Sequence, residues 1–254
     1  MKIIMLAGKG VSTNYIYNGI TSEVNIEKIL ITQSSSTKKM LKRRIKRLGF
    51  LTVFNQLIFQ VFITRTIKVF SKNLYKKRIK DLKLNSNPLP KEKIIEVGLV
   101  NSELTKKTIK NLDPDVIIVN GTAIIGKKIL ECTNALFINT HVGITPQYRG
   151  VHGGYWALRK NDKENFGVTV HKIDKGIDTG EIIGQATTSI KKNDNFLTYP
   201  LYQYALALPL LTKTIQDIKE EKFISYKKED AKSHLYYHPT FTQYLYGWIK
   251  YGIK

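Results

Sequence analysis

Short apolar runs alternate with stretches of helical periodicity through most of the first 140 residues. Ser102 is typical of a helix N-cap and predicts a helix over 103–111. Each apolar run has the length of a strand. The predicted strands cover residues 2–7, 24–32, 93–100, 115–119 and 135–139. Strands separated by helices predict an α/β fold, with a Rossmann-like, mostly parallel sheet and helices on both of its faces.

Residues 37–90 interrupt this alternation and predict a basic helical insertion. A basic helix is expected from Lys38 to Leu48, and a second helix follows from Phe50 to Phe62 with a wide apolar stripe at i, i+3, i+4 spacing. The stripe fits a helix packed on the sheet or on a partner subunit. It also fits an amphipathic element that contacts a membrane surface or an anionic polymer. A loop is expected over 85–90.

The C-terminal part of the chain differs from the rest. Apolar spacing predicts a helix over 196–221, kinked at Pro209. A short extension rich in aromatic rings follows, and such rings can stack on a base or sugar or can pack a dimer. These rings are Tyr236, Tyr237, Tyr244, Tyr246, Trp248 and Tyr251. We therefore divide the chain into a domain over 1–190, which contains the insertion, and an extension over 191–254.

Composition excludes several classes of protein. Hydrophobic residues make up 42% of the 254 residues, which is enough for a packed core and argues against wholesale disorder. The single cysteine, Cys132, rules out a disulfide scaffold and a four-cysteine zinc site. No apolar run approaches the roughly 18–20 residues of a membrane span. The first apolar run turns to glycine too early for a signal peptide. A cytoplasmic protein is expected.

The charge is concentrated in the insertion. The chain carries 41 Lys and Arg against 20 Asp and Glu, for a net charge of +21. Fifteen of the basic residues lie between Thr37 and Lys83, where Asp81 is the one acid. This excess favours an anionic partner for 37–83, such as a membrane surface or an anionic polymer. A nucleic-acid partner is disfavoured because the rest of the chain is only mildly basic.

Residues 139–180 hold a candidate catalytic group. Asn139 and His141 lie two apart at the end of a predicted strand, so both side chains point to one side of the sheet. They could present an amide and an imidazole to one reacting oxygen. Asp178, in a glycine-bounded loop 37 positions after His141, could orient the imidazole or accept a proton.

These motifs resemble the formyltransferase family that uses 10-formyltetrahydrofolate. That family has Asn-x-His, then a Pro-x-x-x-Gly loop, then an Asp-x-Gly loop. The corresponding stretches here are 139–141, 146–150 and 178–180. The resemblance covers 93–190 strongly and 1–32 loosely, and it leaves out 37–90 and the tail.

The resemblance implies a formyltransferase fold and a mechanism without a metal. Asn139 and His141 would hydrogen-bond the developing oxyanion as a substrate amine attacks the formyl carbon. Asp178 would hold His141 and accept the amine proton. The folate pterin would lie between two short backbone segments. These are Ala123, Ile124 and Ile125, and Lys175, Gly176 and Ile177.

Acceptor residues are predicted less directly. Gly8, Gly10 and Ser12 could form a phosphate-binding turn at a helix start, although the same pattern also occurs in plain tight connections. Tyr148, Arg149 and His152 lie near the expected acceptor cleft. Any one of these residues could also have a purely structural role, as a turn former, a cap or a buried polar group. The same holds for Asn139, His141 and Asp178 when each is considered alone. For His171, alternating within a strand, the structural role is preferred.

Three acceptors remain open within the resemblance. A nucleotide-linked amino sugar for surface glycans accounts for the extra length and the basic surface, and is the favoured reading, with a homodimer expected. The 8–12 turn favours glycinamide ribonucleotide as the alternative. Charged initiator tRNA is disfavoured because the 76 residues after Asp178 do not fit a helix and a β-barrel domain. A non-catalytic protein that binds anionic polymers would be expected to have lost the Asn, His or Asp.

Overall fold

The computed structural model describes residues 1–34 and 36–254. Within these residues a seven-stranded sheet has the order β3-β2-β1-β4-β5-β7-β8. Strands β1 to β5 run parallel, and β7 and β8 are antiparallel to their neighbours. The strands are β1 (Ile3–Gly8), β2 (Lys28–Gln33), β3 (Ile94–Leu99), β4 (Val116–Asn120), β5 (Leu136–His141), β7 (Gly167–Lys172) and β8 (Ile182–Thr187). The prediction of a mostly parallel α/β sheet is confirmed.

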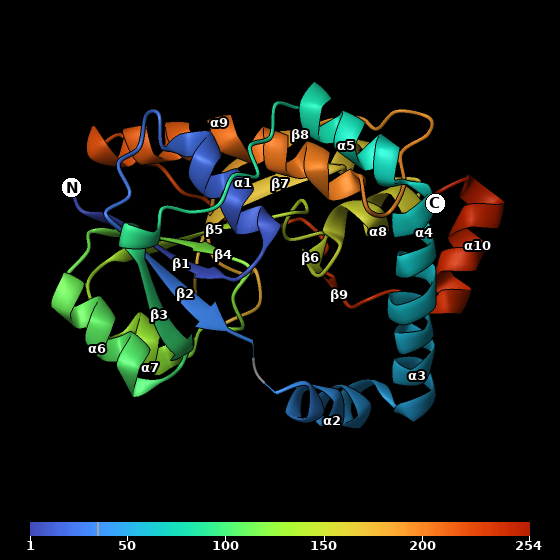
Figure 1. Ribbon diagram of the computed structural model, residues 1–254, viewed down its shortest axis with the longest axis horizontal. Coiled ribbons are helices and arrows are strands. Elements are labelled where there is room, and N and C mark those ends of the chain that lie inside the picture. Colours follow the sequence, from blue (N-terminus) through green and yellow to red (C-terminus); the bar gives the residue numbers. More distant parts are fainter. Residues whose placement is uncertain (35) are drawn as a thin grey trace.

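Helices cover both faces of the sheet (Figure 1). Helices α1 (Val11–Ile20) and α9 (Tyr199–Lys219) pack on one face, and α6 (Glu103–Leu112) and α7 (Lys127–Leu130) pack on the other. Because side chains alternate along a strand, Met5 of β1 joins the core under α1 and α9, and Leu6 joins the core under α6 and α7. Helix α9 thus belongs to the main core, although it lies in the predicted extension.

Local signals explain several boundaries. The Ser102 side chain accepts a hydrogen bond from the Thr105 N–H at 3.1 Å, so the predicted N-cap of α6 is confirmed. Strand β2 was expected from Val24 but begins at Lys28. The N–H groups of Glu23 and Val24 instead donate to the Ile20 carbonyl and extend the turn after α1.

The insertion contains more helix than the two elements expected. After α2 (Thr37–Leu48), helix α3 (Phe50–Ile58), a π-helical turn η1 (Phe59–Ile63) and α4 (Thr64–Phe70) form one continuous rod, and α5 (Lys72–Asp81) follows. We call the segment 50–70 the rod helix. Its buried side packs against α10 (Phe241–Tyr251) in the C-terminal extension, as Figure 1 shows at the right of the molecule.

The rod helix corrects the expectation that no segment approaches the length of a membrane span. By length and composition alone, Phe50–Phe70 is long and apolar enough to cross a bilayer. Polar residues such as Asn55 and Gln60 divide this segment into short apolar runs, so a search for one long apolar run does not find it. In the fold, the rod helix lies along the protein with Val53, Gln56 and Phe59 buried.

A second, two-stranded sheet links the extension to the catalytic loops. Strand β9 (Leu235–Tyr236) pairs in parallel with β6 (Arg149–Gly150), next to the short helix α8 (Gly153–Arg159). Gly150 has φ +93°, and a Cβ atom at this position would collide with the Tyr236 carbonyl oxygen. The glycine therefore allows the close approach of the two strands.

Candidate active site

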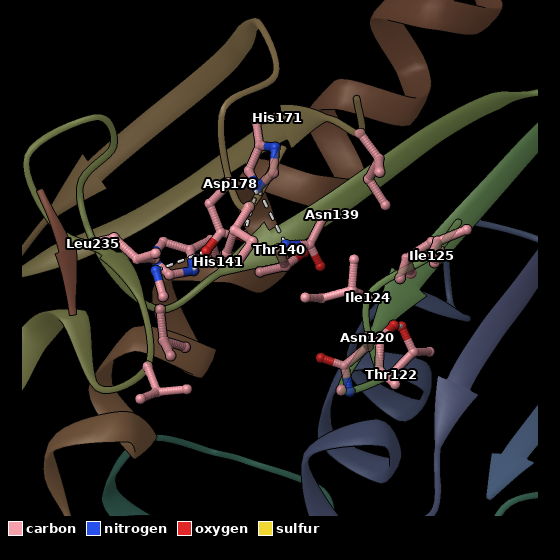
Figure 2. A pocket seen from close by; sticks show the side chains of 18 of the residues that line it. Asn120, Thr122, Ile124, Ile125, Asn139, Thr140, His141, His171, Asp178 and Leu235 are labelled. Atoms are coloured by element: carbon pink, nitrogen blue, oxygen red, sulfur yellow. Dashed lines mark hydrogen bonds and ion pairs between the residues drawn. The ribbon is translucent and has the colours of Figure 1, made fainter. Parts of the chain in front are cut away.

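A cavity of about 580 Å³ opens beside the carboxyl ends of β4 and β5. This is the edge of a parallel α/β sheet where ligands bind. Its wall includes the turn after β4, the end of β5, the loop before Asp178 and, from outside the sheet, residues of α2 and of 235–238. Figure 2 shows Asn139, His141, His171 and Asp178 close together on one side of this cavity.

Asn139 is oriented by His171, its partner across the antiparallel β5–β7 pair. The Asn139 Nδ2 atom lies 3.1 Å from His171 Nε2, and His171 Nδ1 lies 2.7 Å from the Lys172 carbonyl oxygen. A carbonyl only accepts, so we assign the proton to Nδ1, and Nε2 accepts from Asn139. The second N–H of the Asn139 amide is left for a ligand. His171, interpreted from sequence as structural, is therefore part of the site.

His141 is buried between two acceptors. Its Nε2–H donates to the Tyr148 carbonyl oxygen at 2.7 Å, and its Nδ1 lies 3.3 Å from Asp178 Oδ2. Burial lowers the pKa of His141, and the nearby Asp178 carboxylate partly opposes that effect. A neutral imidazole has one N–H, and here it faces two acceptors, the Tyr148 carbonyl and the Asp178 carboxylate. A further proton can therefore be shared between His141 Nδ1 and Asp178.

A glycine makes the contact with Tyr148 possible. A Cβ atom at Gly143 would lie 2.6 Å from the Tyr148 carbonyl oxygen and 2.7 Å from His141 Nε2. Both separations are too short for a carbon atom. Gly143 thus lets the loop fold directly over the imidazole.

Asp178 is held as a carboxylate by its surroundings. Burial alone would raise its pKa, but His141, His171 and the backbone N–H of Gly150 outweigh burial and lower the pKa to about 2. The Gly150 N–H donates to Oδ2 at 2.8 Å, and Oδ1 lies 3.6 Å from His171 Nε2. The residue has φ +50°, in the left-handed region. The Asp178 side chain therefore lies beside both histidines and is hydrogen-bonded to the β6 loop.

The residues that the resemblance assigns to folate are mostly at the cavity. Ala123, Ile124, Ile125, Gly176 and Ile177 line it. Lys175 does not: its side chain is 71% exposed and lies 3.7 Å from the Glu131 carboxylate. The assigned folate contacts stay predictions.

One side chain fixes the turn after β4. Asn101 donates from Nδ2 to the Ile124 carbonyl at 2.9 Å and accepts from the Gly126 N–H at 2.7 Å. These two bonds hold the backbone that faces the cavity at Ala123 and Ile124. Backbone groups in a fixed position are what recognition of a flat heterocycle requires.

Of the six residues predicted for the acceptor, Ser12 lines the cavity, and the other five residues do not. Gly8 packs on Gly121, and Gly10 is the N-cap residue of α1. The Tyr148 hydroxyl donates to Asp162 at 2.7 Å, which turns that ring away from the cavity.

Arg149 and His152 are likewise engaged within the protein. Arg149 Nη1 donates to the Ile177 carbonyl at 2.9 Å, so it fixes the loop beside Asp178. His152 Nε2 lies 2.9 Å from Nδ1 of His238 in the C-terminal extension. Arg149 and His152 thus hold the walls of the site in place. Any contact of either with the acceptor stays a prediction.

Residues 235–238, which we call the closing segment, contain two rings of the aromatic tail, for which ligand stacking and dimer packing were both open. Tyr236, Tyr237 and His238 line the cavity. The aromatic density of the tail was visible in the sequence, but its position was not.

Helix α2 of the insertion reaches the same cavity through Met40 and Arg44. Arg44 Nη2 donates to Gln56 Oε1 at 2.6 Å, and Gln56 Nε2 donates to the His238 carbonyl at 2.7 Å. The Arg47 guanidinium lies 5.2 Å from the centre of the Tyr237 ring. Insertion and closing segment therefore form one wall.

We expect this wall to be sensitive to acid. Burial lowers the pKa of His152 to about 3, and burial with the charge of Arg44 lowers that of His238 to about 4. The unfolded chain binds both protons below about pH 6.5, so the free energy of unfolding falls as the pH drops from there toward 4. From pH 7 to pH 5 the loss is about 2–4 kcal/mol.

Denaturant unfolding at both pH values measures this loss. The variant His238→Gln removes one of these groups, so its loss of stability between pH 7 and pH 5 should be smaller than that of the wild type by about 1–2 kcal/mol. Equal pH dependence in the wild type and the variant would contradict the assignment. The exposed His234 provides the control variant, His234→Gln, which should behave as the wild type does.

The sequence model of the formyl transferase family matches residues 61–200, more than half of the chain. The chain belongs to this family. The match begins inside the insertion, so the family relationship reaches further toward the N-terminus than residue 93, where the strong resemblance began. Within the described residues, no group of three or more His, Cys, Asp or Glu side chains could hold a metal ion.

Curated relatives of this formyl transferase family member include methionyl-tRNA formyltransferases. A methionyl-tRNA formyltransferase of Caldanaerobacter subterraneus is 29% identical over 167 residues, which is 62% of this chain and 53% of that protein. The chain spans about half the length of the curated relatives it matches.

Solved structures confirm the formyltransferase fold. A sugar N-formyltransferase of Shewanella sp. has a TM-score of 0.57 at 13% identity, covering 93% of this chain and 76% of that one. A phosphoribosylglycinamide formyltransferase of Streptococcus pneumoniae has a TM-score of 0.54 at 18% identity, covering 86% and 99%. At these identities the likeness concerns the fold alone.

Proposed function

We propose that this protein transfers the formyl group of 10-formyltetrahydrofolate to the primary amine of a nucleotide-linked amino sugar. The observation that carries formyl transfer is the meeting of Asn139, His141 and Asp178 at one cavity, with the hydrogen bonds described above. Membership of the formyl transferase family supports the same chemistry.

The residues divide the chemical work. The amine nitrogen forms a bond to the formyl carbon, the bond from that carbon to the folate nitrogen breaks, and the amine loses a proton. Asn139 has a free amide N–H for the oxygen that gains negative charge. The His141 N–H is engaged by the Tyr148 carbonyl, so the pair of His141 and Asp178 is better placed for the proton. The departing folate nitrogen takes up a proton in turn.

The cavity fits the folate that supplies the formyl group. Apolar side chains form much of its wall, and the fixed backbone at Ala123 and Ile124 offers hydrogen-bonding groups to a flat ring. These apolar side chains include Val119, Ile125, Ile173 and Ile177. Backbone groups of Gly176 and Ile177 would hold the ring from the other side.

The choice of acceptor rests on the wall formed by α2 and the closing segment. Arg44 is a fixed cation for a phosphate, and the Tyr237 ring is a surface for stacking a base or sugar. A nucleotide-linked sugar carries both features. Glycinamide ribonucleotide is the second candidate, because Ser12 lines the cavity at the start of α1, where helix N–H groups favour phosphate.

A panel of acceptors tests the proposal. Release of tetrahydrofolate from 10-formyltetrahydrofolate is followed with nucleotide-linked 3- and 4-amino sugars, glycinamide ribonucleotide and charged initiator tRNA. Turnover with one amino sugar is the expected result. Turnover with glycinamide ribonucleotide alone would establish the second candidate. Turnover with the tRNA alone, or binding of folate with no turnover, would overturn both.

Arg44→Gln should weaken acceptor binding selectively. Loss of a charge-assisted contact to phosphate is expected to raise KM for the acceptor about tenfold or more, with the Kd for folate unchanged. The neighbouring Arg43 is exposed and does not line the cavity, so Arg43→Gln is the matched control. An unchanged KM in Arg44→Gln would place the acceptor phosphate elsewhere, with Ser12 the next position to test.

A further inference from the structure

We propose that the rod helix and α2 bind the surface of an anionic lipid bilayer, with the protein lying on the membrane rather than spanning it. The formyl-transfer mechanism uses neither the exposed side of the rod helix nor the lysines of α2. The proposal is therefore independent of the acceptor.

The exposed side of the rod helix is mostly apolar, and its exposed polar residues are Arg65, Thr66 and Lys68. Six large side chains on it are each more than half exposed, while Val53, Gln56 and Phe59 face the protein. The six are Phe50, Leu51, Phe54, Phe62, Val69 and Phe70. A run of exposed apolar residues along 21 positions is far from the single exposed residues that are normal on a soluble surface.

The neighbouring helix α10 extends this surface. It lies beside the rod helix in Figure 1, and the Thr242 N–H donates to Asn55 Oδ1 at 3.3 Å. On α10, Trp248 and Tyr246 are about half exposed, and Ile249 is 77% exposed. Trp and Tyr are the residues enriched where protein meets the boundary between lipid and water.

Positive charge lies next to the apolar surface, on α2. Helix α2 carries seven Lys and Arg among twelve residues and no acid. Six of these basic residues are exposed: Lys38, Lys39, Lys42, Arg43, Lys46 and Arg47. Asp81, the one acid between Thr37 and Lys83, is held by Arg78 at 3.1 Å. Residues 241–254 contain no acid at all.

Apolar side chains flanked by lysines and arginines match a bilayer with anionic headgroups. The apolar residues can enter the boundary of the acyl chains while the basic residues contact lipid phosphates. An RNA would use the charge but leave Phe54 and Phe62 unexplained. A second copy of the chain would carry the same positive charge and be repelled by it.

The buried side of the rod helix argues for lying on the membrane. Gln56 Nε2 donates to the His238 carbonyl, and Phe59 is completely buried in a core with Phe196 and Tyr244. Crossing the bilayer would require the rod helix to break these contacts. It would also disrupt the closing segment of the active site. Binding through the exposed side leaves both in place.

Flotation of the full chain with lipid vesicles tests the proposal. Wild-type protein should float with vesicles of phosphatidylcholine and phosphatidylglycerol and bind pure phosphatidylcholine at least about tenfold more weakly. The variant Phe54→Asp/Phe62→Asp should lose at least about tenfold in affinity for the anionic vesicles. The control Leu104→Asp/Ile224→Asp changes two equally exposed apolar residues elsewhere and should bind as the wild type does.

A second pair of variants tests whether vesicle binding depends on the lysines of α2 or only on the net charge of the protein. Lys38, Lys39, Lys42 and Lys46 are replaced by Gln in one protein, and Lys107, Lys110, Lys127 and Lys128 in the other, so both lose four charges. The first variant should lose at least about tenfold in vesicle affinity, and the control should lose little. Equal losses would overturn the proposal.

Three further results would also overturn it. The first is no binding to anionic vesicles by the wild type. The second is binding of a single-stranded RNA that depends on the four α2 lysines but not on Phe54 and Phe62. The third is a dimer in sedimentation velocity that Phe54→Asp/Phe62→Asp dissociates, without any vesicle binding. Formyl transfer in the absence of vesicles should be the same in Phe54→Asp/Phe62→Asp and the wild type, since neither residue lines the cavity.

Discussion

Replacing His141 with alanine is expected to lower formyl transfer by about 10²–10⁴-fold. The imidazole lies between the Tyr148 carbonyl and the Asp178 carboxylate, so its loss removes the group best placed to share the amine proton. Asp178→Asn keeps the shape of the side chain and removes its charge, and should cause a loss of the same order. Release of tetrahydrofolate with the best acceptor of the panel measures both effects.

Two controls distinguish catalysis from folding. Folate binding by calorimetry should remain in both variants, because the backbone at Ala123 and Ile124 is untouched. His234→Ala and Asp230→Asn change the same residue types at exposed positions and should retain full activity. Near-normal turnover in either His141→Ala or Asp178→Asn would refute the assigned roles. Loss of folate binding in both would show that the residues act on the fold of the cavity instead.

The pKa of Asp178 adds a pH test to that variant. Its pKa is lowered to about 2 in the folded protein, against about 3.9 in an unfolded chain. The carboxylate therefore contributes stability above pH 4, on the order of 2 kcal/mol, and this is lost as the pH falls from about 4 to about 2. The stability difference between the wild type and Asp178→Asn should shrink over the same range.

Part of the site could be predicted from the sequence because Asn139 and His141 are only two residues apart. Asn139 and His141 share a side of β5, as residues two apart on a strand must. The sequence favours a structural role for His171 because this residue alternates within a strand, and its contact with Asn139 depends on the antiparallel register of β5 and β7. An expected parallel sheet provides no reason to look for that pair.

The closing segment could not be found in this way. Strands β6 and β9 have two residues each. Strands this short show no alternation of apolar and polar residues by which the sequence could reveal them. Their pairing joins positions 86 apart, Arg149 with Leu235 and Gly150 with Tyr236. The contact of Arg44 with the cavity depends in turn on Gln56 and His238. Side-chain networks of this kind come from tertiary structure, and the separate sequences of α2 and the tail carry no trace of it.

The fold itself was predicted well where one physical rule dominates. Strand β4 is buried on both sides and reads as a continuous apolar run. The insertion was harder because the rod helix is apolar on two sides, one packed and one exposed. Periodicity finds the stripe but does not tell which side meets the protein. Phe59 is buried and Phe62, three positions later, is exposed, so apolar residues close in sequence lie on the packed and the exposed side of the rod helix.

A buried ion pair fastens the end of the insertion to the domain. Arg78 of α5 donates from Nε to Asp194 Oδ1 at 2.7 Å, with the Arg78 side chain 6% exposed and the Asp194 side chain fully buried. Asp194 also accepts from the Tyr202 hydroxyl at 2.6 Å, at the start of α9. Figure 1 shows α5 and α9 close together on this side of the molecule.

Arg78→Ala is therefore expected to lower the free energy of unfolding by about 3–5 kcal/mol, because it leaves the Asp194 carboxylate buried without its cation. Arg65→Ala makes the same substitution at an exposed position of the insertion, and should change stability by less than about 0.5 kcal/mol. The double variant Arg78→Met/Asp194→Asn removes both charges and should recover part of the loss. Denaturant unfolding at pH 7 measures all three. If the double variant were as unstable as Arg78→Ala, the loss would come from packing of the arginine side chain and not from the unpaired charge.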